Sequence, residues 1–225
     1  MIRFDNVTKR YQTGLDALAE VSFEIGTGEI AFVTGHSGAG KSTLLKLVSL
    51  AERPTRGHIT VNERDLARVR RSGVPQHRRG IGMVFQDHRL LTDRSVFDNV
   101  ALPLLIAGTA RAEIGRRVRA ALDKVGLLAR EKALPVALST GEQQRVGIAR
   151  AIVAKPPLII ADEPTGNLDP QLSLEIMNLF ADFGAVGTTV LIASHDLMLL
   201  KHMRRRVLVL DHGRLVDDYR PEQAA

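Results

Sequence analysis

Residues 35–42 have the types and the spacing that bind phosphate groups. They read Gly-His-Ser-Gly-Ala-Gly-Lys-Ser, which fits the pattern G-x4-G-K-[ST]. Glycines allow backbone conformations that other residues avoid, so that successive amide N–H groups can point at phosphate oxygens. Lys41 offers a point charge for the β- and γ-phosphates, and Ser42 offers a hydroxyl ligand for Mg2+. This stretch therefore predicts a binding site for a nucleoside triphosphate with Mg2+.

Two adjacent carboxylates follow the apolar residues 158–161, which predict a buried strand. Ligands of open α/β sheets bind at the carboxyl ends of the strands. We expect Asp162 to hold the hydrated Mg2+, and Glu163 to orient or deprotonate an attacking water. Two carboxylates beside phosphates would repel them without a metal, so the pair itself implies Mg2+. His195 follows another apolar run and would lie at the same edge, where a catalytic and a structural role are both open.

The segments around the phosphate loop predict the strand–loop–helix setting that the motif requires. Residues 30–33 predict a buried strand, and residues 41–51 predict a helix with one apolar face. Residues 2–7 and 21–25 alternate between apolar and polar types, and they predict an antiparallel pair before the phosphate strand.

The rest of the core is predicted from shorter patterns. Residues 58–61 and 81–85 predict short strands, and 206–211 with 214–216 predict a closing hairpin. Residues 63–79 are charged and irregular, which predicts a surface excursion.

Residues 87–154 show a helical pattern that no strand interrupts, and we interpret them as a helical insertion. Helices are predicted at 95–104, 110–125 and 141–154. The second helix has an apolar stripe of Ile114, Val118, Leu122 and Val125.

A capping box introduces the last of these helices. It is formed either by Ser139 with Glu142 or by Thr140 with Gln143. The positive N-terminus of this helix would equally suit an anion.

Composition limits the class of protein. The chain has 225 residues, 44% of them hydrophobic, which suits one domain or one domain with an insertion. It has no cysteine, which excludes disulfides and thiolate metal sites. A net charge of +6 suits contact with an anionic membrane surface or with nucleic acid, or it is simply a solvated basic face. Aromatic residues make up only 4% of the chain, which argues against a protein that stacks aromatic side chains on the bases of single-stranded nucleic acid. No signal segment or membrane-spanning run is visible, so we expect a soluble, cytoplasmic chain.

The order of the motifs resembles that of the ATP-binding subunit of ABC transporters over essentially the whole chain. The matching positions are Tyr11 (adenine-stacking aromatic), 35–42 (Walker A), Gln86 (Q-loop), 138–143 (signature), 158–163 (Walker B), 167–169 (D-loop) and His195 (switch histidine). Residues 84–103 and 162–169 resemble more narrowly the FtsE family of bacterial cell-division ATP-binding proteins, which pairs with the membrane protein FtsX.

The resemblance implies an α/β fold of the P-loop NTPase (RecA-like) type. This fold has a parallel-sheet core, an N-terminal antiparallel β subdomain and an inserted α-helical subdomain. Residues 1–86 and 155–225 would form the nucleotide-binding core of a single ABC ATPase domain, and residues 87–154 would form the helical subdomain with the signature motif.

The resemblance also implies a head-to-tail homodimer with two ATP molecules at its interface. Each ATP would lie between the phosphate loop of one subunit and Ser139 and Gly141 of the other. The implied catalytic residues are Glu163 as general base, His195, Lys41 and Gln86. The implied metal ligands are Ser42, Gln86 and Asp162. The implied nucleotide-binding residues are Tyr11, Gly35, His36, Ser37, Gly38, Ala39, Gly40, Lys41, Ser42, Thr43, Ser139, Gly141, Gln143 and Asp169.

The implied partner is an FtsX-like integral membrane protein, which would hold the chain at the cytoplasmic face of the bacterial inner membrane, at the division septum. Contact with anionic lipid would suit the basic charge, and specific nucleic-acid binding is not expected. A related alternative is the ATPase of a lipoprotein-release or macrolide-export transporter. An alternative of another class is a soluble ABC ATPase acting on nucleic acid.

One departure from the family pattern concerns the signature motif, which is usually Leu-Ser-Gly-Gly. This chain has Thr140 at the third position. The β-branched side chain stands where a backbone normally approaches the partner's nucleotide, and we expect it to weaken dimer closure or turnover.

Overall fold

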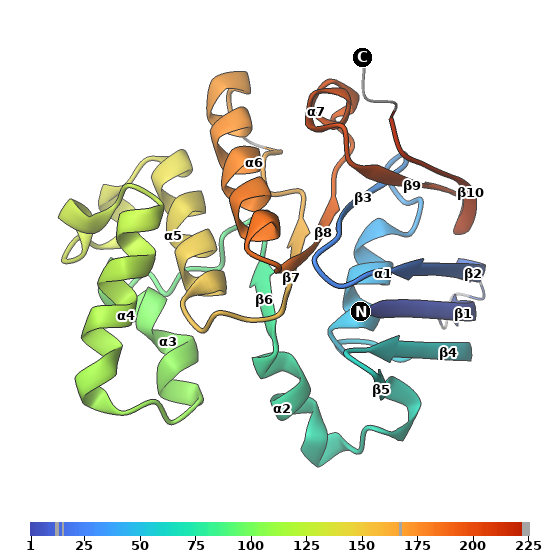
Figure 1. Cartoon of the computed structure of the whole chain (residues 1–225), viewed down its shortest axis with the longest axis horizontal. Helices are drawn as coiled ribbons and strands as arrows, with labels where there is room; N and C mark the ends of the chain where they lie inside the picture. The colour runs from blue at the N-terminus through green and yellow to red at the C-terminus, as the bar shows by residue number, and fades with distance from the viewer. Residues whose placement is uncertain (12–13, 15, 167, 222–225) are drawn as a thin grey trace.

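A computed structural model describes residues 1–11, 14, 16–166 and 168–221. A parallel sheet lies between a four-stranded sheet on one side and a group of helices on the other (Figure 1). Among the described residues, no helix has the length and apolar character needed to cross a membrane.

The main sheet carries the phosphate loop on a central strand. Its strands are β3 (Ile30–Thr34), β6 (Ile81–Val84), β7 (Leu158–Asp162), β8 (Thr189–Ala193), β9 (Arg206–Asp211) and β10 (Arg214–Tyr219). They lie in the order β10-β9-β3-β8-β7-β6, and all pairs are parallel except β10 with β9. Every residue of β3 and β8 is buried, and apart from Thr34 and Thr189 at their ends both strands are apolar. The segments after β3, β6, β7 and β8 therefore leave the sheet at one edge.

The second sheet confirms the predicted antiparallel pair. It has the order β2-β1-β4-β5, with β1 (Ile2–Arg10), β2 (Asp16–Ile25), β4 (Arg56–Val61) and β5 (Arg64–Asp65). Its inward residues alternate along β1, and Phe4 stacks on Phe23 with 4.6 Å between the ring centroids. This face packs with α1 (Lys41–Val48) and one face of the main sheet in a shared core.

The helical region contains α3 (Val96–Ile106), α4 (Arg111–Lys124) and α5 (Thr140–Ile152). The predicted stripe on α4 is buried, as expected. These helices share one continuous core with Phe32 and Val190 of the main sheet, so the insertion packs directly on the strands. The division into a core and a helical subdomain at 87–154 stays a prediction.

Two more helices complete the layers. The first is α6 (Pro170–Ala185), which lies between the helical region and the strands, and the second is α7 (Leu197–Met203), which follows β8 (Figure 1). The apolar spacing along α6 predicts a buried face of Leu172, Ile176, Leu179, Phe180 and Phe183. The structure corrects this face, because Ser173 and Met177 are buried with Ile176 and Phe180, whereas Leu172 is only partly buried.

The prediction of an irregular excursion at 63–79 was wrong in part. This segment contains β5, two 3-10 turns and α2 (Val74–Arg79). His77 is buried and its Nε2 lies 2.8 Å from the carbonyl oxygen of Val48, while Arg78 donates to the carbonyl oxygens of Ser49 and Leu50. These oxygens are the unsatisfied acceptors at the end of α1, so α2 caps the phosphate-loop helix.

The phosphate-loop helix ends at Val48, three residues earlier than predicted. The Ser49 hydroxyl donates to the carbonyl oxygens of Leu45 and Lys46, and Leu50 takes a left-handed conformation with φ of 53°. This side-chain bonding competes with a further turn of helix.

Candidate nucleotide site

The phosphate loop joins β3 to α1 through backbone conformations that only glycine adopts easily. Gly35 has φ of 148° and Gly40 has φ of 109°. A Cβ on Gly35 would stand 2.2 Å from the carbonyl oxygen of Leu210, and a Cβ on Gly40 would stand 2.5 Å from that of Ala17. Gly40 is the N-cap of α1 and has no side chain to bond the first-turn amides, which leaves them free for an anion.

Lys41 points back into its own loop. Its Nζ donates to the carbonyl oxygens of Gly35, at 2.8 Å, and His36, at 3.2 Å. The side chain is only 7% exposed and lies 3.7 Å from a carboxylate oxygen of Glu163. Two carbonyls and a neighbouring carboxylate thus hold the Lys41 ammonium at the place where the loop would bind phosphate.

Ser42 and Asp162 meet across the site. The Ser42 hydroxyl donates to the Asp162 carboxylate at 3.1 Å, although 120 residues separate them. Burial raises the pKa of Asp162 and the charge of Glu163 raises it further, while the hydrogen bond from Ser42 opposes both effects. A bound cation would offset the cost of ionising the partly buried Asp162 carboxylate. Because Mg2+ prefers oxygen ligands, the Ser42 hydroxyl and this carboxylate suit that ion.

Glu163 and His195 form the next pair. The Nδ1 atom of His195 lies 3.1 Å from Oε2 of Glu163. Glu163 itself has φ of 46°, uncommon for a residue with a side chain, and its amide donates to the carbonyl of Ala193. A pocket of about 160 Å3 lies beside this pair and has room for water.

Gln86 follows β6 and reaches the same corner. Its amide nitrogen and Oε2 of Glu163 both lie 3.6 Å from the place where a Cβ of Gly166 would stand. The phosphate loop, Gln86, Asp162, Glu163 and His195 therefore lie at one edge of the main sheet. The strand pattern predicted this shared edge for Asp162, Glu163 and His195. Their catalytic and metal-binding roles stay predictions.

Tyr11 lies at the end of β1. Lys9 places its ammonium 4.9 Å above the centre of the Tyr11 ring. The ring is therefore already in contact with a cation, and its stacking on adenine stays a prediction.

The remaining loop residues have the placement expected of a nucleotide cradle. His36, Ser37 and Gly38 are exposed, whereas Ala39 is buried and Thr43 is partly buried in the first turn of α1.

The signature residues lie apart from the phosphate loop of their own chain. They begin α5, on the far side of α6 from α1 (Figure 1). The capping box is formed by Ser139 and Glu142 and not by Thr140 and Gln143. The side chain of Gln143 donates to the carbonyl oxygen of Leu138 instead.

The residues after Glu163 lead into α6. Asp169 caps this helix by accepting from the amide of Leu172 at 3.0 Å. Asn167 of the predicted D-loop lies outside the described residues.

Arg150 was missed by the sequence reasoning. From α5 it donates to the carbonyl oxygens of His88 and Arg89, both at 2.6 Å. These two residues have left-handed backbones directly after Gln86. Arg150 thus ties the segment after Gln86 to the helix that begins at the signature motif, and nothing in the local sequence distinguishes it from the other arginines.

Known proteins match this chain along nearly its whole length. The family model described as ABC transporter matches residues 18–166. With the fold and the site described above, this match defines an ATPase of the ABC class. The cell division ATP-binding protein FtsE of Escherichia coli K12 is 57% identical over 215 residues, 96% of this chain and 97% of that protein. The FtsE proteins of Mycobacterium tuberculosis and Bacillus subtilis are 47% and 44% identical over 97% of this chain, which covers 95% and 96% of their lengths. The chain belongs to the FtsE family.

Solved structures agree with this assignment. A dimeric ATP-binding cassette in a post-hydrolysis state, bound to ADP and Pi, has a TM-score of 0.91 and 31% identity, with 100% of both chains covered. A second dimeric structure of a bacterial ABC transporter cassette gives the same TM-score at 32% identity, again over 100% of both chains.

Proposed function

We propose that this chain is the Mg-ATP-hydrolysing subunit of a membrane complex that acts in bacterial cell division. Two copies close head to tail over two ATP molecules, and this motion drives an FtsX-like membrane protein that regulates peptidoglycan hydrolysis. The observation that carries the dimer is the separation of Ser139 and Gly141 from the phosphate loop of their own chain. The dimeric relative bound to ADP and Pi supports the same arrangement.

Different side chains bind the phosphates, the metal ion and the adenine. Lys41 and the amides of the loop bind the β- and γ-phosphates, and Ser42, Asp162 and Gln86 hold the ion. Bound Mg2+ would supply positive charge against the phosphate oxygens. Tyr11 stacks on the adenine, and Ser139, Gly141 and Gln143 of the second copy, with Asp169, complete the nucleotide site.

Glu163 is the general base. It takes a proton from a water that attacks the γ-phosphorus, while the bond to the bridging oxygen of the β-phosphate breaks. The 3.1 Å contact with His195 and the 3.7 Å contact with Lys41 fix the carboxylate for this step. His195 holds the γ-phosphate and the water.

The proposed place of work is the cytoplasmic face of the inner membrane, at the septum. The FtsE names of the relatives support a role in division. The net charge of +6 supports contact with anionic lipid beside the membrane partner.

A trap for the closed state tests this function. Tagged Glu163→Gln should bind ATP without hydrolysing it, so membranes solubilised with Mg-ATP should release it together with its partner. Mass spectrometry should identify an FtsX-like protein, and Lys41→Ala should lose it because the phosphates are no longer bound. Capture of a lipoprotein-release or macrolide-export permease would instead leave the ATPase mechanism in place and assign the complex to transport rather than cell division. Capture of nucleic-acid proteins, or no capture that depends on ATP, would contradict the proposal.

A further inference from the structure

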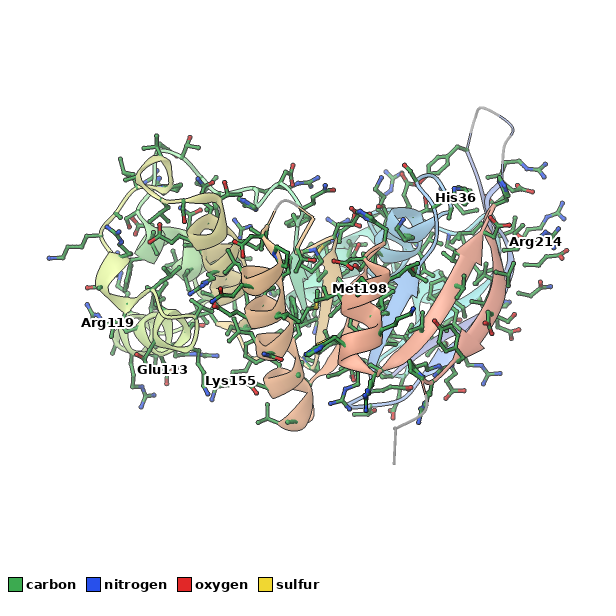
Figure 2. The ribbon with its side chains drawn as sticks, turned by 90° about the horizontal axis from the view of Figure 1, so that it is seen from above. His36, Glu113, Arg119, Lys155, Met198 and Arg214 are labelled. Carbon is green, nitrogen blue, oxygen red and sulfur yellow. The ribbon has the colours of Figure 1, made fainter. Side chains whose placement is uncertain are left out.

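A cluster of metal-ligating side chains joins one residue of the phosphate loop to two residues that have no role in the site described above. It consists of His36, in the loop, Asp211, the last residue of β9, and His212, in the turn between β9 and β10. Figure 2 shows His36 at the same end of the molecule as Arg214, the first residue of β10. One ligand atom from each of the three side chains lies within 4.8 Å of the other two.

The backbone holds the two loops together. The amide of Gly213 donates to the carbonyl of Ala39 in the phosphate loop at 3.1 Å, and the carbonyl of Gly213 accepts from the amide of Ala19. His212 has a left-handed backbone with φ of 44°. The three side chains therefore come from a fixed framework, although 175 positions of sequence separate His36 from Asp211.

The hydrogen bonding of His36 leaves one of its nitrogens facing a carboxylate. Its Nδ1 lies 2.6 Å from the carbonyl oxygen of Ser37, a contact that requires this nitrogen to donate. In the neutral ring Nε2 then carries only a lone pair, yet it lies 3.1 Å from Oδ1 of Asp211. Two acceptors repel each other at that distance unless the ring takes a second proton or a cation binds both atoms.

A cation bound between Nε2 of His36 and the Asp211 carboxylate matches the way histidine ligates metals. A ligating imidazole usually donates its other N–H to a backbone carbonyl or a carboxylate, which fixes its tautomer. Nε2 of His212 lies 3.8 Å from the same Asp211 oxygen, and the rings of His36 and His212 are 4.8 Å apart. His212 is 83% exposed, so a metal can enter from solvent and the ring can rotate inward.

We propose that His36, Asp211 and His212 form a binding site for a transition-metal dication, of which Zn2+ is the natural probe. Two imidazole nitrogens, one carboxylate oxygen and a water make the tetrahedral set that Zn2+ prefers, with ligand bonds of about 2.0–2.2 Å. The site is separate from the predicted Mg2+ site, because Mg2+ prefers oxygen ligands and imidazole suits Zn2+ and its neighbours. Bound metal would cross-link the phosphate loop to the β9–β10 turn.

A competition titration with a chromophoric chelator tests the site. The whole purified chain is titrated with Zn2+ without nucleotide, in excess Mg2+ that occupies the oxygen-only site. Wild type should bind one equivalent. His212→Asn and Asp211→Asn should each weaken that binding by at least about tenfold, because loss of a group that merely supports a metal ligand already costs about 10–100-fold. His202→Asn removes another exposed histidine, on α7, and should leave the affinity unchanged.

Two further measurements keep the test independent of damage to the fold. Without metal, the exposed substitutions should leave the thermal midpoint unchanged, whereas Zn2+ should raise the midpoint of wild type and not that of His212→Asn. Co2+ added to wild type should give the visible absorption of a tetrahedral nitrogen and oxygen site. Absence of stoichiometric Zn2+ binding would overturn the proposal. Binding that is equal in wild type and in both variants would overturn it as well.

Discussion

At the scale of single residues, the site contains a strained backbone and a partly buried carboxylate, both of which cost free energy. Glu163 has a left-handed backbone, and burial raises the pKa of its neighbour Asp162. Such conformations and charges persist at functional sites because the surroundings fix them. The ladder bond from Glu163 to Ala193 and the contact with His195 provide that support.

Thr140 gives a prediction at this scale. It is the exposed first residue of α5, between two residues proposed to face the partner's nucleotide. Thr140→Gly should raise both the ATPase rate and ATP-driven dimerisation, because the backbone can approach more closely. Glycine in place of threonine should also cost only about 0.3 kcal/mol in the free energy of unfolding, because threonine is itself a poor helix former, and urea denaturation measures this change. An unchanged rate together with unchanged dimerisation would show that Thr140 does not hinder closure.

The residues divide into those that local sequence reveals and those that it does not. Lys41, Asp162 and Glu163 follow from motif and strand pattern, because a parallel sheet brings strand ends together. Gln86 follows only from the order of the family motifs. The role of Arg150 follows from neither, because its partners are backbone carbonyls of a left-handed turn 61 residues away. Every residue has a backbone carbonyl, so the residue types do not reveal these partners.

At the scale of elements, the contact of β6 with α5 joins the helical region to the sheet. Gly82 of β6 has no room for a side chain, because a Cβ would stand 2.5 Å from the carbonyl oxygen of Ala151. Gly82→Ala should lower the free energy of unfolding by about 1–3 kcal/mol, since backbone must shift. Urea denaturation followed by circular dichroism measures this change.

The matched control for Gly82 is Gly115, in the interior of α4. A Cβ there would meet only the guanidinium end of Arg119, at 3.6 Å. Gly115→Ala should therefore stabilise the protein by about 0.5–1 kcal/mol through helix propensity. If both substitutions changed stability in the same direction, the close packing of β6 on α5 would not be the cause.

Element boundaries were harder to predict than element types. Strand β3 was predicted to within one residue, because burial on both faces leaves a nearly continuous apolar run. Strands β1 and β2 instead extend three and five residues beyond the predicted 2–7 and 21–25. The helix α2 was missed because it is short and has no apolar stripe, and its His77 and Arg78 contact carbonyls at the end of α1. Capping across 29 residues of sequence has no local pattern.

At the scale of the whole molecule, Arg206 joins both sheets to the closing hairpin. It forms two hydrogen bonds with Asp218 of β10, at 2.8 and 2.7 Å, and donates to Glu29 and to the carbonyl of Glu24. These bonds from Arg206 hold the pKa of Asp218 below its ordinary value. Burial raises the pKa of Glu29, but hydrogen bonds from the Gly26 amide and from Arg206 lower it overall.

The stability that Arg206 provides should therefore depend on pH. Carboxyls whose pKa is lowered in the folded state add stability that is complete above their ordinary pKa and is lost as the pH falls through the lowered values. Arg206→Met should cost about 1–2 kcal/mol at pH 7 and progressively less below about pH 4.5. Urea titrations of wild type and variant from pH 7 to pH 3 measure the difference, and a constant difference would contradict this origin.

Light scattering of Glu163→Gln with Mg-ATP would show whether two copies close over the nucleotide. The Lys41→Ala variant serves as the control that cannot hold the phosphates. We predict that Glu163→Gln doubles its mass when Mg-ATP is added and stays dimeric because it cannot hydrolyse the nucleotide, whereas Lys41→Ala stays monomeric. A Glu163→Gln protein that binds ATP and remains a monomer would contradict the account.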